Sequence, residues 1–400
     1  MRILHTSDWH LGRTLHGVDL LEHQAAYLDH LVDLVRAEGV SAVVVSGDVY
    51  DRAVPPVEAV QLLGDALARL TEHATVVVTP GNHDSAIRLG FGSALMRSPL
   101  HVRARVSELG RPVELADEHG PVLVYALPYL DPDATRRELA DDRAVDGALP
   151  RSHEAVTAAA MRRVRADLRG RAGGSARPRT LVMAHAFVMG GQPSESERDI
   201  RVGGVDSVPA AVFDGVDYVA LGHLHGAQRI SMPAGHQDAG PSPVLQYSGS
   251  PLAYSFSERH HRKASVLVDL DAHGVSRDVE LIAAPVPRRL SEVQGTLDDL
   301  LGAAGDAHRD DWVRVVVTDA ARPAELYARV RTRFPHALVV EHRPPTSGDA
   351  RPAGPVTAGR DPLEVADEFV QHVTGTPPTS AERAVLRAAY EYVLAGERSA

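Results

Sequence analysis

The first part of the chain alternates short apolar runs with longer segments in which apolar residues recur every three or four positions. The runs at Ile3–Thr6, Ala42–Val45 and Thr75–Val78 have the length and apolar character of buried strands. The segments at 21–35 and 60–70, which lie between these runs, have the spacing of amphipathic helices. This β-α-β-α-β order predicts a parallel sheet at the start of the chain.

The alternation continues to about residue 282, with two strand-like runs around a polar turn, another helical segment and four later apolar runs. These elements are predicted at 112–115, 121–127, 154–168, 181–184, 218–221, 244–247 and 264–268. We therefore expect a first domain over residues 1–282 and an α/β (α+β) fold class for the chain.

The pattern changes at about residue 283. Two strands with a helix between them, at 312–317, 324–333 and 337–341, predict a small separate α+β domain over residues 283–345.

Two further segments follow this domain. Residues 346–361 are rich in Pro, Gly, Ser and Thr and predict a linker. Residues 362–400 predict two helices, at 363–373 and 380–395. The first of these has an apolar face with little local core to cover. It either docks on another molecule or folds back on its own chain.

Composition limits the chemistry. Hydrophobic residues make up 44% of the 400 residues, which suffices for a large core without cross-links. The chain contains no cysteine, so disulfides and thiolate zinc sites are excluded, and any metal must be held by His, Asp, Glu or Asn. No signal peptide and no apolar stretch long enough to cross a bilayer is present, so we expect a soluble, cytoplasmic protein with no membrane partner.

The net charge of −11 argues mildly against a nucleic-acid partner, but such a partner is recognised by a local patch rather than by the whole chain. Two basic segments stand out, an arginine-rich run at 162–179 and a cluster at 259–263. Each alone is typical of a solvated helix face or loop. Arg88 and the arginine in the segment 13–16 are weaker candidates for phosphate contacts.

Five polar pieces each follow a predicted strand directly. They are Asp8-Trp9-His10, Gly47-Asp48, Gly81-Asn82-His83-Asp84, His185 and Gly222-His223-Leu224-His225. The carboxyl ends of strands in an α/β sheet share one edge, so we expect the five pieces to converge there. Any one piece alone would be weak evidence, and histidines such as His5, His23, His30 and His73 are interpreted as structural.

The residue types in these pieces suit two divalent ions. Carboxylates, imidazoles and an amide oxygen match Mn²⁺, Fe²⁺ or Mg²⁺ better than a soft ion. Two ions about 3.5–4 Å apart clamp the attacking and leaving oxygens of a phosphoryl displacement. Asp48 is the natural bridging carboxylate, because its strand is expected between the strands that carry Asp8 and Asn82.

In this order the pieces resemble the calcineurin-like metallophosphoesterase superfamily, whose pattern is D-x-H, G-D, G-N-H-D/E, a His and G-H-x-H. The resemblance implies a β-sandwich flanked by helices. It also implies that one metal is held by Asp8, His10, Asp48 and His225 and the other by Asp48, Asn82, His185 and His223. By the same resemblance His83 protonates the leaving oxygen, and Asp84 orients or tunes His83.

Longer matches narrow the resemblance. The stretches MRILHTSDWHLG, SGDVYDRAVPP, GNHDS, ALGHLH and YSGSPLAYSF are similar to the SbcD-type bacterial nuclease subunits. The resemblance covers about residues 1–265, and beyond them only the layout of a capping domain, a linker and C-terminal helices agrees. One departure from other branches is Asp51, where archaeal and eukaryotic relatives carry a His, so no second catalytic His is carried over.

The resemblance to SbcD-type subunits implies a Mn²⁺-dependent nuclease. Its activities would be 3′-to-5′ exonuclease cleavage of duplex DNA and endonuclease cleavage of single strands and hairpins, in DNA repair and recombination. It also implies a homodimer and an SbcC-type ATPase as partner, on which the helices of residues 362–400 would dock. The chain has no P-loop of its own, since its single lysine, Lys263, lacks the required glycines.

Two alternatives stay open on the sequence. The metal motif equally fits a cyclic-nucleotide phosphodiesterase or a protein phosphatase of the same fold, although these need no capping domain, linker or partner helices. A non-catalytic scaffold with a degenerate site would also bind DNA ends or a partner. Against it, every expected ligand and His83 are present.

Overall fold

The computed structural model describes residues 1–140, 147–171, 177–200, 207–232, 242–276, 278–345 and 361–397. The chain divides into two compact units, Met1–Ser291 and Glu292–Ala400. The expected domain boundary at residue 282 stays a prediction. The expected linker at 346–361 lies outside the described residues except for Asp361.

The first unit is built on two sheets. The seven-stranded sheet has the order β16-β15-β1-β4-β5-β6, and β17 also pairs with β15. Strands β1, β4, β5 and β6 run parallel, whereas β15 runs antiparallel beside β1. The bounds are β1 Arg2–Thr6, β4 Ala42–Ser46, β5 Thr75–Thr79, β6 Leu100–Val102, β15 Ala264–Asp271, β16 Gly274–Val275 and β17 Glu280–Ala283.

The second, six-stranded sheet has the order β13-β14-β12-β9-β8-β7. Its four central strands are parallel, and the two edge strands are antiparallel to their neighbours. The bounds are β7 Val113–Asp117, β8 Gly120–Ala126, β9 Arg179–His185, β12 Tyr218–Gly222, β13 Gln228–Ile230 and β14 Val244–Tyr247. Short pairs, β2 Thr14–Leu15 with β3 Val18–Asp19 and β10 Phe187–Val188 with β11 Ser207–Val208, lie outside the two sheets.

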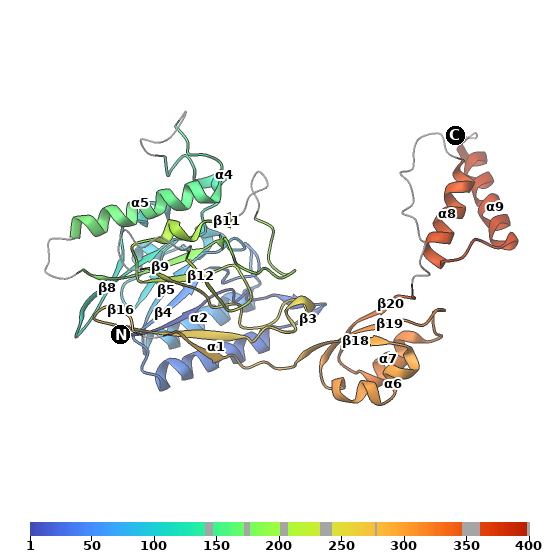
Figure 1. Cartoon of the computed structure of the whole chain (residues 1–400), viewed down its shortest axis with the longest axis horizontal. Coiled ribbons are helices and arrows are strands. Elements are labelled where there is room, and N and C mark those ends of the chain that lie inside the picture. The colour runs from blue at the N-terminus through green and yellow to red at the C-terminus, as the bar shows by residue number, and fades with distance from the viewer. Residues whose placement is uncertain are drawn as a thin grey trace. The chain divides into compact units, whose positions relative to one another are not determined.

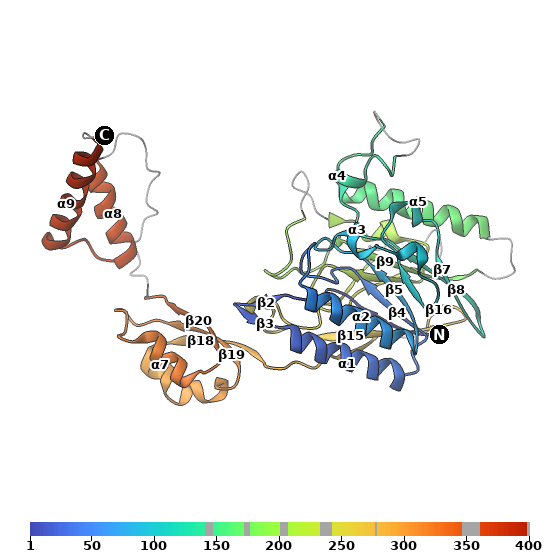
Figure 2. The same ribbon diagram turned by 180° about the vertical axis from the view of Figure 1, so that it is seen from behind.

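Helices cover the outer face of each sheet, as Figures 1 and 2 show. Helices α1 (Leu21–Ala37) and α2 (Val57–Thr71) share a core with β1, β4 and β5, and α5 (His153–Arg171) shares a core with β9 and β12. A third core lies between the sheets and joins Val44 and Val77 to Leu181 and Met183. Alternate residues of each central strand thus face a helix or the other sheet, which explains the uninterrupted apolar runs in the sequence.

The fold class and the β-sandwich flanked by helices are confirmed, and every strand and helix expected between residues 1 and 282 is present within a few residues. The initial β-α-β-α-β segment is parallel, as expected. The complete first sheet is mixed because β15 pairs with β1 from a distant part of the chain. The short helices α3 (Ala86–Leu89) and α4 (Pro132–Thr135) were not expected.

Two arginines of the run at 162–179, Arg165 and Arg179, are less solvated than the sequence indicated. Arg165 is half-buried and donates to the carbonyl oxygens of Val212 and Asp214 at 2.7–3.2 Å. The side chain of Arg179 is only 3% exposed and pairs with Asp117. These arginines therefore hold the fold together rather than offering a basic surface.

The second unit includes a small α+β region. Its three-stranded sheet has the order β18-β19-β20, with β18 Leu290–Gly295, β19 Trp312–Val317 and β20 Ala337–His342. Helices α6 (Leu297–Leu301) and α7 (Leu326–Arg333) share its core, which includes Val315 and Phe334.

The C-terminal segment forms two helices, α8 (Pro362–Thr374) and α9 (Ser380–Glu397), as the sequence predicted. An ion pair between Arg383 Nε and Asp367 Oδ2 at 2.7 Å joins them. In α8, Phe369 and Val373 are 65% and 62% exposed. Within the described residues, no helix combines the length and the apolar character needed to cross a membrane.

Candidate metal centre

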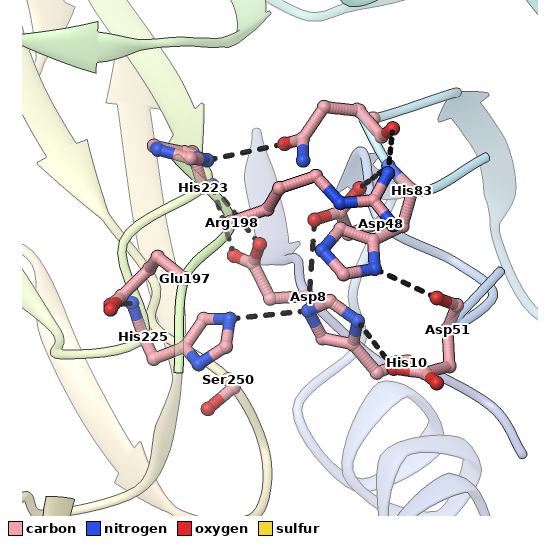
Figure 3. A network of polar contacts seen from close by, with 12 residues as sticks. Asp8, His10, Asp48, Asp51, His83, Glu197, Arg198, His223, His225 and Ser250 are labelled. Atoms are coloured by element: carbon pink, nitrogen blue, oxygen red, sulfur yellow. Dashed lines mark hydrogen bonds and ion pairs between the residues drawn. The ribbon is translucent and has the colours of Figure 1, made fainter. Parts of the chain in front are cut away.

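The five polar pieces lie at the carboxyl ends of five strands. Asp8 follows β1, Asp48 follows β4 and Asn82 follows β5, whereas His185 ends β9 and His223 follows β12. The two sheets meet at this edge, because His185 Nδ1 lies 2.9 Å from the carbonyl oxygen of Ser46 at the end of β4. The structure thus brings all five pieces together (Figure 3).

Backbone conformation marks the same residues. Four of the expected ligands have positive φ angles, namely Asp8 (55°), His10 (47°), Asp48 (49°) and His223 (106°). Among the described non-glycine residues, only His16 and Glu325 share this property. Such conformations cost on the order of 1–3 kcal/mol each and persist where the surroundings impose them, often at functional sites.

Two glycines of the motifs are required by close approach. A Cβ atom on Gly81 would collide with the carboxylate of Asp48, and one on Gly222 would collide with the carbonyl oxygen of Ser46. The glycines of G-N-H-D and G-H-x-H therefore permit the loops from the two sheets to pack against the G-D loop.

The first group of potential ligands comprises Asp8, His10 and His225, all buried, whose donor atoms lie within 4.8 Å of one another. The Nε2 atoms of His10 and His225 face each other at 3.1 Å. Asp8 is held in place because both of its carboxylate oxygens accept from the backbone N–H of His223, at 3.0 and 3.2 Å. In Figure 3 these side chains point toward one common point.

The second group gathers around Asn82. Its Oδ1 lies 2.9 Å from His185 Nε2 and 3.2 Å from His223 Nδ1. Asp48 lies between the two groups, with Oδ2 3.6 Å from His10 Nε2 and 3.4 Å from His185 Nε2. This is the position required of a bridging carboxylate. The donor set of carboxylates, imidazoles and one amide oxygen fits two divalent ions.

Protonation is consistent with ligand roles. Burial lowers the pKa of His10 to about 3, so its imidazole is neutral at physiological pH. Burial also disfavours the charged form of His185, but the adjacent Asp48 carboxylate outweighs this effect and raises the pKa of His185 to about 9. An ion that binds at His185 therefore has to displace a proton.

His83 and Asp84 lie beside the ligands but play different parts. His83 Nδ1 lies 2.7 Å from the carbonyl oxygen of Asp51, which leaves its Nε2 to face the site. The carboxylate of Asp84 accepts from the backbone N–H groups of Val49, Tyr50 and Gly81 at 2.9–3.0 Å. Asp84 thus joins the loops that carry Asp48 and Asn82, and the expectation that it orients or tunes His83 stays a prediction.

Several residues around the site were not found by sequence reasoning. Asp51, noted only as a departure from relatives, positions His83 through its carbonyl and places its carboxylate 3.6 Å from His10 Nδ1. Lys263, interpreted as part of a basic surface cluster, is only 5% exposed and pairs with Glu258 behind His225. Its uniqueness as the single lysine was the only available signal.

The two candidate phosphate-contacting arginines are engaged in the fold. Arg13 is 16% exposed, donates to the carbonyl oxygen of Ser196 at 3.1 Å and stacks over the Tyr254 ring at 4.8 Å. Arg88 donates to the carbonyl oxygen of Ala53 at 3.0 Å. Arg198 is instead at the mouth of the site, exposed and 3.4 Å from the carbonyl oxygen of Asn82 (Figure 3).

Comparison with known proteins gives one functional description and several distant folds. The chain is 29% identical over 350 residues to the SbcD subunit of the nuclease SbcCD of Staphylococcus saprophyticus, covering 86% of this chain and 85% of the relative. A dimetal phosphatase of Danio rerio is 13% identical over 71% of this chain and 99% of its own, with a TM-score of 0.42. A Thermus thermophilus protein is 16% identical over 70% of this chain and 98% of its own, with a TM-score of 0.39.

Two family models match separate parts of the chain. The type 5 capsule protein repressor C-terminal domain matches residues 286–374, which include the small α+β domain and α8. The calcineurin-like phosphoesterase model matches residues 1–227, more than half of the 400 residues and all five polar pieces. The chain therefore belongs to the calcineurin-like phosphoesterase family and is a metal-dependent phosphoesterase.

Proposed function

We propose that this chain is the nuclease subunit of a DNA-repair and recombination complex. It cuts phosphodiester bonds as a 3′-to-5′ exonuclease on duplex DNA and as an endonuclease on single strands and hairpins. The two-metal mechanism is supported above all by the position of Asp48. Its Oδ2 lies 3.6 Å from His10 Nε2 and 3.4 Å from His185 Nε2. The choice of DNA is supported by the similarity to the nuclease of Staphylococcus saprophyticus over 86% of the chain.

We assign the ions to two positions that share Asp48. Asp8, His10 and His225 complete the first, and Asn82, His185 and His223 complete the second. Two Mn²⁺ ions supply positive charge for the phosphate oxygens and make water acidic enough to attack at neutral pH. Mg²⁺ and Fe²⁺ have ligand preferences close enough to compete.

His83 supplies the proton for the leaving oxygen. Because the carbonyl oxygen of Asp51 accepts at 2.7 Å, His83 Nδ1 carries a hydrogen, and the proton transferred to the leaving oxygen is the second one of the imidazolium form, on Nε2. Arg198 adds a positive charge at the mouth of the site, where a phosphate of the strand enters. The chain's own residues thus provide a general acid and a phosphate contact beside the ions.

The complex requires two further contacts. An SbcC-type ATPase docks on the exposed apolar face of α8 and α9, which includes Phe369, Val373 and Val385 at 62–70% exposure. A chain that ends near residue 345 should lose this partner in a pull-down with the purified ATPase, while full-affinity binding of the shortened chain would contradict the assignment. Because the proposed substrate is the DNA of the cell, we assign the complex to the cytoplasm.

The second contact is a homodimer. Six exposed apolar side chains lie on the neighbouring segments 54–60 and 87–95, which the hydrogen bond between Arg88 and Ala53 ties together. They are Val54, Val57, Val60, Ile87, Phe91 and Leu95, which are 47–88% exposed, and we propose that they form one apolar patch. A second copy of the chain would cover it.

The activity is tested by incubating the purified chain with Mn²⁺ and single-stranded, hairpin and duplex DNA, beside an Asp8→Ala control and a small phosphodiester. DNA cleavage that requires both Mn²⁺ and Asp8 is expected. Hydrolysis of the small phosphodiester with DNA left intact, even after the ATPase is added, would move the chain to the small-substrate phosphodiesterases. No hydrolysis of any substrate would favour a scaffold.

A further inference from the structure

A buried polar cluster lies behind His225, on the side opposite His10. It comprises Ser196, Ser250, Glu258 and Lys263, and we call it the His225 support cluster. Glu258 is 1% exposed and Lys263 is 5% exposed. Both are charged side chains that almost never lose contact with water unless they are paired.

The cluster determines which nitrogen of His225 carries hydrogen. His225 Nδ1 lies 2.6 Å from the Ser196 hydroxyl and 3.2 Å from Glu258 Oε1. The Ser196 hydroxyl donates its only proton to the same Glu258 oxygen. The hydrogen between Ser196 and His225 must therefore sit on Nδ1. This leaves the lone pair on Nε2, which faces His10 Nε2 at 3.1 Å.

Lys263 fixes both the carboxylate and the backbone of the ligand. Its ammonium group pairs with Glu258 Oε2 and donates to Ser250 Oγ at 2.9 Å and to the carbonyl oxygen of His225 at 3.0 Å. All three of its N–H donors are thus used. The imidazole is held through Glu258 and the main chain through Lys263, so the ring cannot turn without breaking this network.

Stability alone does not explain such a pair. The desolvation of two buried charges roughly cancels their attraction, and apolar residues of similar volume often stabilise a fold equally well. A carboxylate behind a histidine ligand, by contrast, fixes its tautomer and orientation, and its loss typically costs 10–100-fold in metal affinity or activity.

We infer that Glu258 and Lys263 are positioning residues for the metal centre and determine the affinity of the one ion position that His225 serves. The inference rests on the metal assignment of the proposed function. It goes beyond that assignment in predicting that loss of the cluster weakens one ion and not the other. Among the hydrogen bonds of the described residues, no member of the cluster contacts His185, His223 or Asn82.

The test is Mn²⁺ titration of the metal-free full-length chain by calorimetry, with bound metal counted by mass spectrometry. In Glu258→Gln, one of two Mn²⁺ ions should bind 10–100-fold more weakly while the other is unaffected. The matched control is Asp217→Asn, an equally isosteric change at a buried carboxylate that binds Thr180 N at 2.7 Å and Arg177 at the opposite end of β12. It should bind both ions as the wild type does.

A second variant guards against loss of folding in Glu258→Gln. Ser196→Ala removes the hydroxyl beside His225 Nδ1 without leaving a buried charge unpaired, and it should weaken the same ion by a smaller factor. Normal binding of both ions in folded Glu258→Gln, or in Ser196→Ala if Glu258→Gln does not fold, would overturn the inference. Equal weakening of both ions would do the same. If the wild type itself fails to bind two ions, the proposed metal centre fails instead.

Discussion

Asp48 and His185 come from different sheets, yet Asp48 Oδ2 lies 3.4 Å from His185 Nε2. The two side chains lie at the edge at which the sheets meet. Asp48 Oδ2 also lies 3.6 Å from His10 Nε2. A single carboxylate thus connects donor atoms from both ligand groups. We therefore expect the two proposed ion positions to be interdependent.

Replacement of Asp48 should therefore affect both ions at once. Asp48→Asn keeps the shape of the side chain but removes its charge, so both Mn²⁺ ions should bind at least about 10-fold more weakly. Because a ligand stabilises the state that it binds, the same Mn²⁺ concentration should raise the melting temperature of the wild type by more than that of the variant. Thermal melts with and without Mn²⁺ measure this. If the variant keeps the full Mn²⁺-dependent rise in melting temperature, Asp48 is not the bridging ligand.

The general acid should be separable from the metal ligands. His83→Ala should keep both ions, because no expected ligand bond is lost, and should slow DNA cleavage by about 10²–10⁴-fold. The defect should be much smaller with bis(p-nitrophenyl) phosphate, whose leaving group needs no proton. The measurement is the ratio of the two rates in variant and wild type. An equal loss on both substrates would show that His83 acts by another route, such as metal binding.

Asp84 should act on the fold of the site rather than on the protonation of His83. Asp84→Ala leaves three backbone N–H groups, on Val49, Tyr50 and Gly81, without their acceptor. We expect a loss of about 2 kcal/mol in the free energy of unfolding. Urea denaturation in EDTA measures it without a contribution from metal. Glu118→Ala, at a carboxylate that is 86% exposed, is the control and should change stability by less than about 0.5 kcal/mol. An unchanged free energy of unfolding in Asp84→Ala would mean that these backbone contacts do not stabilise the site.

The convergence of the five polar pieces could be predicted from sequence because its signals are local. Each piece follows an apolar run with the length of a buried strand, and the parallel order brings the ends of these strands to one edge. The expected position of Asp48 between the other two pieces is confirmed, since β4 lies between β1 and β5. Its bridging role, the ligand set and the general acid stay predictions.

The support of these ligands could not be predicted, because it depends on pairing between distant segments. Glu258 and Lys263 stand in a stretch that is basic by composition, and only the approach of His225 shows that they are buried. The partners of Asp84 are backbone N–H groups, which every residue except proline has, so residue types do not indicate them. In the same way, no periodicity in β15 shows that it will pair antiparallel with β1.

Acid should destabilise the first unit through Asp117. A hydrogen bond from the buried Arg179 and the nearby N-terminal amino group hold the pKa of Asp117 well below its usual range. Because the folded pKa lies below the unfolded value of about 3.9, the stabilisation is present above that pH and is lost as the pH falls through the folded pKa.

Asp117→Asn should therefore reduce the free energy of unfolding at pH 7 by on the order of 3 kcal/mol, because it leaves buried Arg179 without the carboxylate that balances its charge. The difference from the wild type should shrink as the pH is lowered below about 4. Urea midpoints across this pH range measure it, with Glu118→Gln as control, since Glu118 is 86% exposed. A difference that does not depend on pH would mean that the Asp117 charge is not responsible.

The apolar patch offers a test of the homodimer that leaves the metal centre in place. Phe91 is 85% exposed on the patch, so Phe91→Asp should not harm the monomer fold. In a symmetric dimer each substitution occurs in both subunits. Each buried Phe contributes about 1.5–3 kcal/mol to the free energy of association. The variant dimer should therefore dissociate at micromolar concentration. Analytical ultracentrifugation measures the mass. Phe369→Asp, the same change at a 65% exposed residue of α8, should leave the dimer intact. A wild-type chain that is monomeric, or a Phe91→Asp dimer of unchanged affinity, would show that the patch is covered by something other than a second copy.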